Sequence, residues 1–164
     1  MTSRLATLCL LVACHPPVRV EPPRPADVAT VDGILQAFYD VVNLAPEAPR
    51  QWSRDRTLYA PWIRFVGIGR GRDVWTHAQL VDATEPLVRA GFRERELKRT
   101  TRVYGNIVHV DSTYETLLGL HPPLRRERGV NSLELYYDGS RWWIASVMWQ
   151  SETAEHPIPP ALLP

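Results

Sequence analysis

The sequence predicts an α+β domain in which about three N-terminal helices pack on one face of a strongly curved antiparallel sheet. Apolar residues recur at helical spacing between Val31 and Val42. Nearly everything from Phe92 onward is rich in β-branched and aromatic residues, which favour strands. The pair Asp138-Gly139 between two such runs is typical of a hairpin. Helices first and strands afterwards exclude an alternating parallel architecture.

Length and composition allow one folded domain between two proline-rich flanks. The chain has 164 residues, of which 45% are hydrophobic and 23% charged, with a net charge of +1. We expect a proline-rich tether at 14–26, the domain at 27–151 and a proline-rich tail at 152–164. A nearly neutral chain lacks the basic excess that binding to a phosphate backbone requires, so we expect no nucleic-acid partner.

The first residues have the order of a secretory signal. A short polar stretch with one positive charge precedes the apolar run Leu5–Ala13, and Cys14 closes it. The run is too short to span a bilayer. This order resembles a bacterial lipoprotein signal peptide over 1–13, which implies export and anchoring to the membrane by lipid on Cys14 alone, on the periplasmic or outer-membrane side. A buried N-terminal helix or a misplaced start codon would be the alternatives.

Each helix has a recognisable start and stop. Asp27 or Thr30 can cap the first helix and Pro46 ends it. A short second helix carrying Trp52 fits between Pro49 and Pro61. The third has the capping-box form Thr76-His77-Ala78-Gln79, and we expect it to run to about Ala90, with a kink at Pro86 and a stop at Gly91.

The strands follow from alternation and turn residues. Gly67, Gly69 and Gly71 predict a turn after the first strand, and the triple Arg125, Arg126 and Arg128 predicts a loop between two hairpins. The expected strands are Trp62–Ile68, Arg93–Tyr104, Ile107–Leu117, Val130–Tyr137 and Trp142–Ser151.

Three stretches near the C-terminus carry a family resemblance: Gly129-Val130-Asn131-Ser132, Tyr136-Tyr137-Asp138-Gly139 and Trp142-Trp143-Ile144. With the order of elements, they resemble the nuclear transport factor 2-like superfamily, in particular its bacterial SnoaL-like members, over residues 28–151. The resemblance implies a cystatin-like α+β roll, in which a bent sheet wraps around helices as a cone open at one end to a pocket. It also implies a homodimer through the outer face of the sheet.

The chemistry of the superfamily's ketosteroid isomerases is not expected. Those enzymes use a Tyr on the first helix, a basic Asp on the first strand and a protonated Asp on a later strand. The resemblance places Phe38 and Phe65 at the first two positions and Leu133 or Asn131 at the third. These side chains are apolar or amides, so they cannot replace a phenol and two carboxyl groups.

His109 and Asp111 are the weak catalytic candidates. They alternate with Val108 and Val110 along one strand and share a face with Thr113 and Glu115. Such a set can bind a metal or run acid–base chemistry. We favour the alternative, a polar face of a half-buried strand whose acids pair with residues of the neighbouring strand such as Arg99 or Arg102. We therefore expect no metal and no cofactor, and a capping role for His77.

Aromatic residues are the more informative signal for a site, because Tyr and Trp combine apolar rings with polar groups. Asn131 shares a strand face with apolar residues and must find a partner. We expect a pocket that binds a small, mostly apolar molecule or mediates interaction without catalysis; the alternative is a SnoaL-like cyclase, isomerase or hydrolase with a His/carboxylate pair in the cavity. The expected pocket residues are Phe38, Tyr39, Trp52, Tyr59, Trp62, Phe65, Tyr114, Asn131 and Trp149.

Overall fold

The computed structural model describes residues 21–45, 48–69, 71–121 and 123–164. The predicted signal peptide, Cys14 and Pro46 lie outside these ranges. None of the described helices is long and apolar enough to cross a membrane. The elements are α1 (Pro25–Val28), α2 (Val31–Asp40), α3 (Trp52–Arg56), β1 (Phe65–Ile68), β2 (Arg72–Trp75), α4 (His77–Arg89), β3 (Phe92–Tyr104), β4 (Ile107–Leu118), β5 (Arg125–Tyr137), β6 (Trp142–Ser151) and the 3₁₀ turn η1 (Pro160–Leu162).

Six strands form one sheet in the order β2-β1-β6-β5-β4-β3. The four long strands are an antiparallel meander, as expected. The sheet is mixed, however, because β1 runs parallel to β6. The expectation of a purely antiparallel sheet was therefore wrong at this one pairing. In sequence order α3 precedes β1, and α4 connects β2 to the meander. This path places β1 beside β6, at the edge of the meander.

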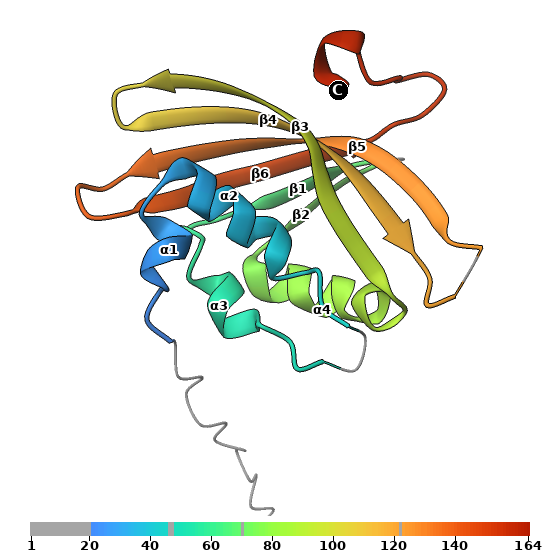
Figure 1. The fold of residues 1–164 in the computed structure, drawn as a ribbon, viewed down its shortest axis with the longest axis horizontal. Helices are drawn as coiled ribbons and strands as arrows, with labels where there is room; N and C mark the ends of the chain where they lie inside the picture. Colours follow the sequence, from blue (N-terminus) through green and yellow to red (C-terminus); the bar gives the residue numbers. More distant parts are fainter. Residues whose placement is uncertain (1–20, 46–47, 70, 122) are drawn as a thin grey trace, which may run out of the picture.

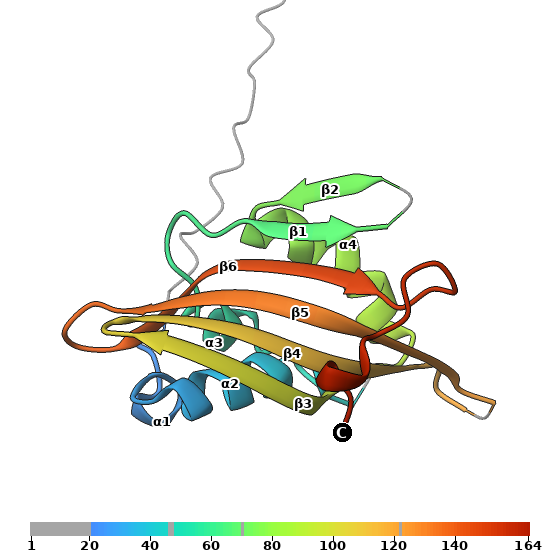
Figure 2. The ribbon, with the colours of Figure 1, turned by 90° about the horizontal axis from the view of Figure 1, so that it is seen from above.

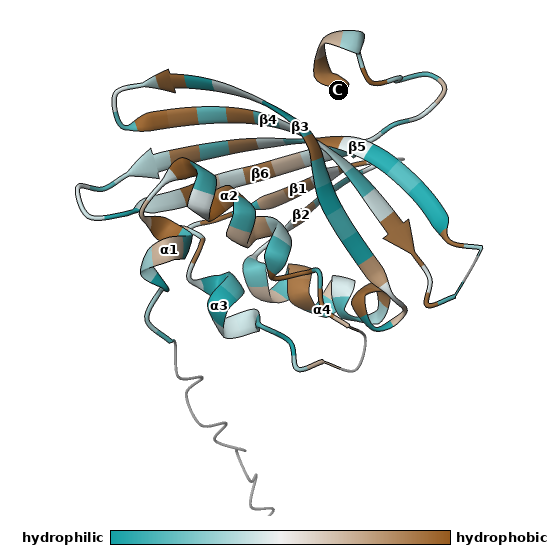
Figure 3. Cartoon of the chain, in the orientation of Figure 1, coloured by the Kyte–Doolittle hydropathy of each residue, from teal (hydrophilic) through white to brown (hydrophobic). Residues whose placement is uncertain are grey.

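The helices α1 to α4 cover one face of the sheet, and the other face carries the C-terminal tail (Figures 1 and 2). Hydrophobic residues gather on α2, on part of α4 and along the middle strands (Figure 3). The core between these layers contains Ile34 and Leu35 from α2, Leu133 and Leu135 from β5, and Ile144 from β6, all at most 1% exposed. The predicted α+β class with helices on one sheet face is confirmed.

The N-terminal helices are fixed by one cap and one ion pair. The Thr30 hydroxyl accepts from the Gly33 amide at 2.9 Å, which is the N-cap of α2. Asp27 does not cap this helix; it lies in α1 and accepts two hydrogen bonds from Arg54, at 2.7 and 2.8 Å. The Arg54 hydrogen bonds hold the pKa of Asp27 below its usual value. This pair ties α1 to α3.

Most predicted elements agree with the structure, but the first predicted helix is divided into α1 and α2, and α2 ends at Asp40, before Pro46. The capping box at Thr76 and Gln79 is formed, and α4 ends beside Gly91, whose φ is 94°. The glycine-rich turn after β1 is present, but β1 begins at Phe65 and not at Trp62, and the turn leads into a strand that was not predicted, β2. The expectation of a loop at the arginines was wrong, because β5 begins at Arg125. The arginines of this segment pair with acidic residues across strands, which lets a charged run continue the ladder.

Two β-bulges interrupt the register of the sheet. One is at Leu97 of β3, between Glu96 and Lys98, and the other is at Ala145 of β6, opposite Glu134 and Leu135 of β5. A bulge adds one residue to one strand and increases its local bend. In Figure 1 the end of β3 that begins at Phe92 curves towards α4, which closes one side of the space beneath the sheet.

The C-terminal tail folds back onto the outer face of the sheet (Figure 2). The Thr113 hydroxyl donates to the Leu162 carbonyl at 2.6 Å, and Lys98 donates to the Leu163 carbonyl at 2.7 Å. Ile158 in the same segment is 7% exposed. The tail therefore packs on β3 and β4, where it covers part of the surface on which a second copy was expected.

Candidate functional site

A cavity of about 300 Å³ lies between the concave face of the sheet, α2, α3 and α4. Helix α4 contributes a row at helical spacing: Leu80, Val81, Thr84, Leu87 and Val88. The facing strands contribute Phe92 and Glu94 from β3, Tyr114, Thr116 and Leu118 from β4, Asn131 from β5, and Val147 and Trp149 from β6. The lining is thus mostly apolar, with a few polar groups at defined points.

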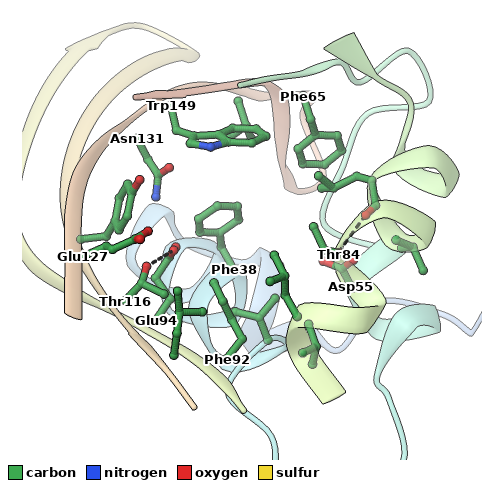
Figure 4. A pocket seen from close by; sticks show the side chains of 18 of the residues that line it. Phe38, Asp55, Phe65, Thr84, Phe92, Glu94, Thr116, Glu127, Asn131 and Trp149 are labelled. Carbon is green, nitrogen blue, oxygen red and sulfur yellow. Dashed lines mark hydrogen bonds between the residues drawn. The ribbon is translucent and has the colours of Figure 1, made fainter. Parts of the chain in front are cut away.

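Seven of the nine expected pocket residues line this cavity. They come from α2, α3, the segment after α3, and four strands, and they are Phe38, Trp52, Tyr59, Phe65, Tyr114, Asn131 and Trp149. In Figure 4, Phe38, Phe65 and Trp149 form its aromatic middle. Trp149 stacks on Trp75 with ring centroids 5.6 Å apart. Gly67 allows this stacking, because a Cβ there would lie within 3.0 Å of both indoles.

Two expected pocket residues lie elsewhere. Trp62 is 59% exposed and stacks on Tyr136, so its ring belongs to the surface. Tyr39 is buried beneath the cavity wall, where its hydroxyl lies 2.6 Å from Ser112 Oγ and accepts from Asn131 Nδ2 at 3.2 Å. Tyr39 thus supports a lining residue and is not one itself.

Glu94 is the polar centre of one end of the cavity (Figure 4). Thr116 Oγ1 donates to Glu94 Oε2 at 3.1 Å. Burial raises the pKa of Glu94 to about 7, and hydrogen bonds from Thr116 and Asn131 offset only part of that rise. Nearby, burial raises the pKa of the Tyr114 phenol to about 12. A carboxyl group with such a pKa changes charge near neutral pH.

Asp55 occupies the opposite end of the cavity, as Figure 4 shows. It is 4% exposed and accepts from the Tyr59 hydroxyl at 2.8 Å. Its other oxygen lies 2.6 Å from His77 Nε2. His77 borders a second, smaller hollow on the other side of Asp55 with Ser53, Arg56 and Asp82. The first residue of α4 therefore has a carboxylate partner in addition to its place beside the cap.

His109 and Asp111 face away from the cavity. Their neighbours Val108 and Val110 are buried in the core, so strand alternation turns both polar side chains to the outer face. His109 Nδ1 lies 2.5 Å from Glu134, and His109 Nε2 lies 3.2 Å from Asp111. The expected partners Arg99 and Arg102 do not hold Asp111; His109 does. The His/carboxylate pair at the cavity wall is instead Asp55 with His77.

Comparisons with solved structures give the fold. A putative dehydratase of the NTF2-like family from Streptomyces avermitilis is similar with a TM-score of 0.60 and 16% identity, over 78% of this chain and 97% of that one. An uncharacterised protein with a cystatin-like fold from Caulobacter vibrioides is similar with a TM-score of 0.58 and 16% identity, over 76% of this chain and 89% of that one. A putative calcium/calmodulin-dependent protein kinase II association domain from Xanthomonas campestris is similar with a TM-score of 0.57 and 14% identity, over 74% of this chain and 88% of that one.

The chain has the NTF2-like, cystatin-like fold. No protein-family model matches the sequence. No curated protein matches it either. At these identities the likeness concerns the backbone alone, and the chemistry of this NTF2-like cone depends on its own side chains.

Three carboxylates line the NTF2-like cavity, Glu94, Asp55 and Glu127, and none of them was predicted from the sequence. Glu94 stands in the run Phe92-Arg93-Glu94-Arg95-Glu96, which has the appearance of a solvated charged strand. One signal was available: strict alternation from the apolar Phe92 places Glu94 on the same face. For Asp55 no comparable signal exists, since its partner His77 is 22 residues away on another helix.

Proposed function

We propose that the chain binds a small, mostly apolar molecule with one polar end inside the cone. The observation that carries this proposal is the cavity of about 300 Å³, whose aromatic middle separates two polar ends at Glu94 and Asp55. Ligand sites are typically concave, apolar and fitted with a few oriented polar groups, and this volume lies at their lower limit. We also propose membership among the SnoaL-like proteins, which the element order and the C-terminal hairpin support.

A matched pair of substitutions tests the ligand-binding proposal. Leu80→Trp fills the cavity from α4, whereas Leu117→Trp makes the same change on the outer side of β4. We expect the purified domain to bind 1-N-phenylnaphthylamine with increased fluorescence, and Leu80→Trp to abolish this binding while Leu117→Trp keeps it. Circular dichroism checks that both variants fold. Equal binding by both would place the probe outside the cavity and contradict the proposal.

We further propose that the chain is exported and held at the membrane by lipid on Cys14. The support is the order of charge, apolar run, small residue and cysteine at the N-terminus. The experiment is expression in a bacterium with radiolabelled palmitate, followed by mass spectrometry of the mature N-terminus. Label on the wild type and none on Cys14→Ser is the expected result. A mature N-terminus other than Cys14 would contradict the anchor.

A homodimer through the outer sheet face is a further proposal. An apolar row crosses this face where the tail does not cover it: Val74, Val66 and Met148 lie opposite one another on β2, β1 and β6. Val74 and Met148 are 50% and 47% exposed. Light scattering should give twice the mass of the chain, and Met148→Glu should give the single mass. A monomeric wild type would contradict this arrangement.

Proton-transfer catalysis is the second candidate function, and the Asp55–His77 pair favours it. Asp55 borders the cavity while His77 holds it from behind, which is the arrangement of a base and a positioning partner. We expect the protein to accelerate deuterium incorporation into 2-tetralone, followed by NMR, and Asp55→Asn to abolish this. The matched change Asp111→Asn on the outer face should have no effect. No acceleration by the wild type would reject this candidate.

A further inference from the structure

Within the described part of the chain, Glu94 differs from the other acids of the cavity wall because it has no cationic partner. Asp55 lies 2.6 Å from His77 Nε2, and Glu127 is 2.9 Å from Arg125. Among the described residues that line the cavity, Glu94 is the acid whose only side-chain hydrogen bonds come from neutral groups, Thr116 and Asn131. Such a carboxylate is costly to bury unless a positive charge approaches it.

A chain of hydrogen bonds with defined donors and acceptors fixes the orientation of the Asn131 side-chain amide beside Glu94. Ser112 Oγ donates to Glu96 Oε1 at 2.6 Å, so its oxygen must accept from the Tyr39 hydroxyl, 2.6 Å away. The Tyr39 oxygen in turn accepts from Asn131 Nδ2 at 3.2 Å. Asn131 therefore turns its amide nitrogen towards Tyr39 and Glu94, and Figure 4 shows its carbonyl oxygen on the cavity side.

At the other end of this hydrogen-bond chain, Glu96 is held as an acceptor by Arg99. Arg99 donates to both oxygens of Glu96, at 3.0 Å from Nε and 2.7 Å from the terminal nitrogen, and to Asp32 at 2.7 Å. Glu96 thus accepts from both Arg99 and Ser112, and the pKa of Arg99 is raised by its pairing with Glu96. The polar end of the cavity consequently offers two acceptors side by side, the Asn131 carbonyl and the Glu94 carboxylate.

Aromatic rings surround the same space. Phe38 lies between Trp149 and Glu94 in Figure 4, and Tyr114 also lines this end. The faces of aromatic rings attract cations, most strongly where water is excluded. A positively charged head at Glu94 would therefore meet a carboxylate, an amide oxygen and ring faces, while an apolar body would extend towards Phe65 and α4.

We propose that the cavity selects organic ammonium ions, in which a protonated amine carries an apolar body, over neutral molecules of the same shape. This proposal rests on the proposed function, because it names the class of molecule that the cone binds. The ionisable groups around Glu94 are the phenols of Tyr39, Tyr59 and Tyr114, the acids Asp55 and Glu127, and Arg125 beside Glu127. Acids thus outnumber bases around the ligand space.

The test compares 2-phenylethylammonium with 2-phenylethanol, and hexylammonium with hexanol, by titration calorimetry on the domain 21–164. At pH 8 each ammonium ion should bind about tenfold more tightly than its alcohol, as expected for one charge-assisted hydrogen bond. The preference should shrink at pH 5.5, where Glu94 is protonated. Glu94→Gln should bind both members of a pair equally, and Glu134→Gln on the outer face should keep the preference.

The outcomes separate the two proposals. Equal binding of ammonium ion and alcohol by the wild type at pH 8 overturns the cation proposal and leaves the apolar pocket standing. Binding of neither, by a chain that circular dichroism shows to be folded, overturns both. If Glu94→Gln fails to fold, the pH dependence of the wild-type preference decides, and a preference equal at pH 5.5 and pH 8 counts against Glu94 as its source.

Discussion

Asn43 binds both the backbone amide and the backbone carbonyl of Glu94. Its Oδ1 accepts from the Glu94 amide at 2.7 Å, and its Nδ2 donates to the Glu94 carbonyl oxygen. The same Nδ2 donates to the Tyr39 carbonyl at 2.9 Å. Asn43 lies just beyond the end of α2, so this contact connects the first long helix to the strand that carries the buried carboxyl group. The position of Glu94 is thus set by a helix more than 50 residues earlier in the chain.

Asn43→Ala should loosen this connection and destabilise the fold by about 1–3 kcal/mol, because it leaves the Glu94 amide without its acceptor. Urea denaturation followed by tryptophan fluorescence measures the change. Asn106→Ala, at the exposed tip of the β3–β4 hairpin, is the control and should cost far less. Equal effects of the two changes would show that the Asn43 contact carries no special stability.

Glu94 should make the protein less stable as the pH rises. Its pKa is about 7 in the folded chain against an ordinary 4.5, so the folded state holds the proton more tightly than the unfolded state. The resulting stability is fully present below about pH 4.5 and is lost as the pH rises to about 7, by up to about 3 kcal/mol. Denaturation curves at pH 5 and pH 8 measure it.

Two variants identify the group responsible for this pH dependence. Glu94→Gln should remove the decline between pH 5 and pH 8. Glu115→Gln should leave it, because hydrogen bonds from Arg95 lower the pKa of Glu115, and the stability it contributes is lost only when the pH falls through that lowered value. A decline that persists unchanged in Glu94→Gln would assign it to another group.

The Asp27–Arg54 pair should matter more than the surface pair Glu85–Arg89. Asp27 and Arg54 have side chains only 9% and 11% exposed, whereas Arg89 is 71% exposed. Removing one partner of a buried pair leaves an uncompensated charge, so we expect Asp27→Ala to cost about 3 kcal/mol. Glu85→Ala should cost less than about 1 kcal/mol. Thermal denaturation at low and high salt measures the loss of stability in each variant.

Gly129→Ala should change the shape of the cavity by displacing the Tyr114 side chain that lines it. A Cβ at Gly129 would overlap the Tyr114 hydroxyl and the Gln150 carbonyl, so the phenol must move into the cavity or the strand must shift. We expect a loss of about 1–3 kcal/mol in stability and weaker binding of phenylnaphthylamine. Gly69→Ala, which has open space around its Cβ, is the control. Unchanged binding in Gly129→Ala would contradict this account.

Deleting residues 157–164 should destabilise the domain and uncover β3 and β4. The deletion removes the hydrogen bonds from Thr113 and Lys98 and the burial of Ile158, which by itself contributes about 2 kcal/mol. Urea denaturation measures the loss, with Ile158→Ala as the partial version. A truncated chain as stable as the full one would show that the tail is not part of the folded unit.

The sequence by itself determined most of the secondary structure, because its signals are local. Thr76 and Gln79 form a capping box within one helical turn, and Asp138 organises its hairpin by accepting from the amides of Ser140 and Arg141 at 2.8 and 2.9 Å. Apolar spacing likewise identified the buried faces of α2 and of the last strands. These features depend on residues a few positions apart, so they can be predicted from the sequence without the tertiary structure.

Only the tertiary structure decided the site. Asp55 meets His77 across 22 residues, Asn43 meets Glu94 across 51, and Asn131 meets Tyr39 across 92. The parallel pairing of β1 with β6 and the bulge before Lys98, which sets the face that each later residue of β3 presents, are equally non-local. Burial then changed the chemistry of what was brought together: Glu94 is an ordinary acid in the sequence, and the cavity gives it a pKa near neutrality because little around it can solvate its charge.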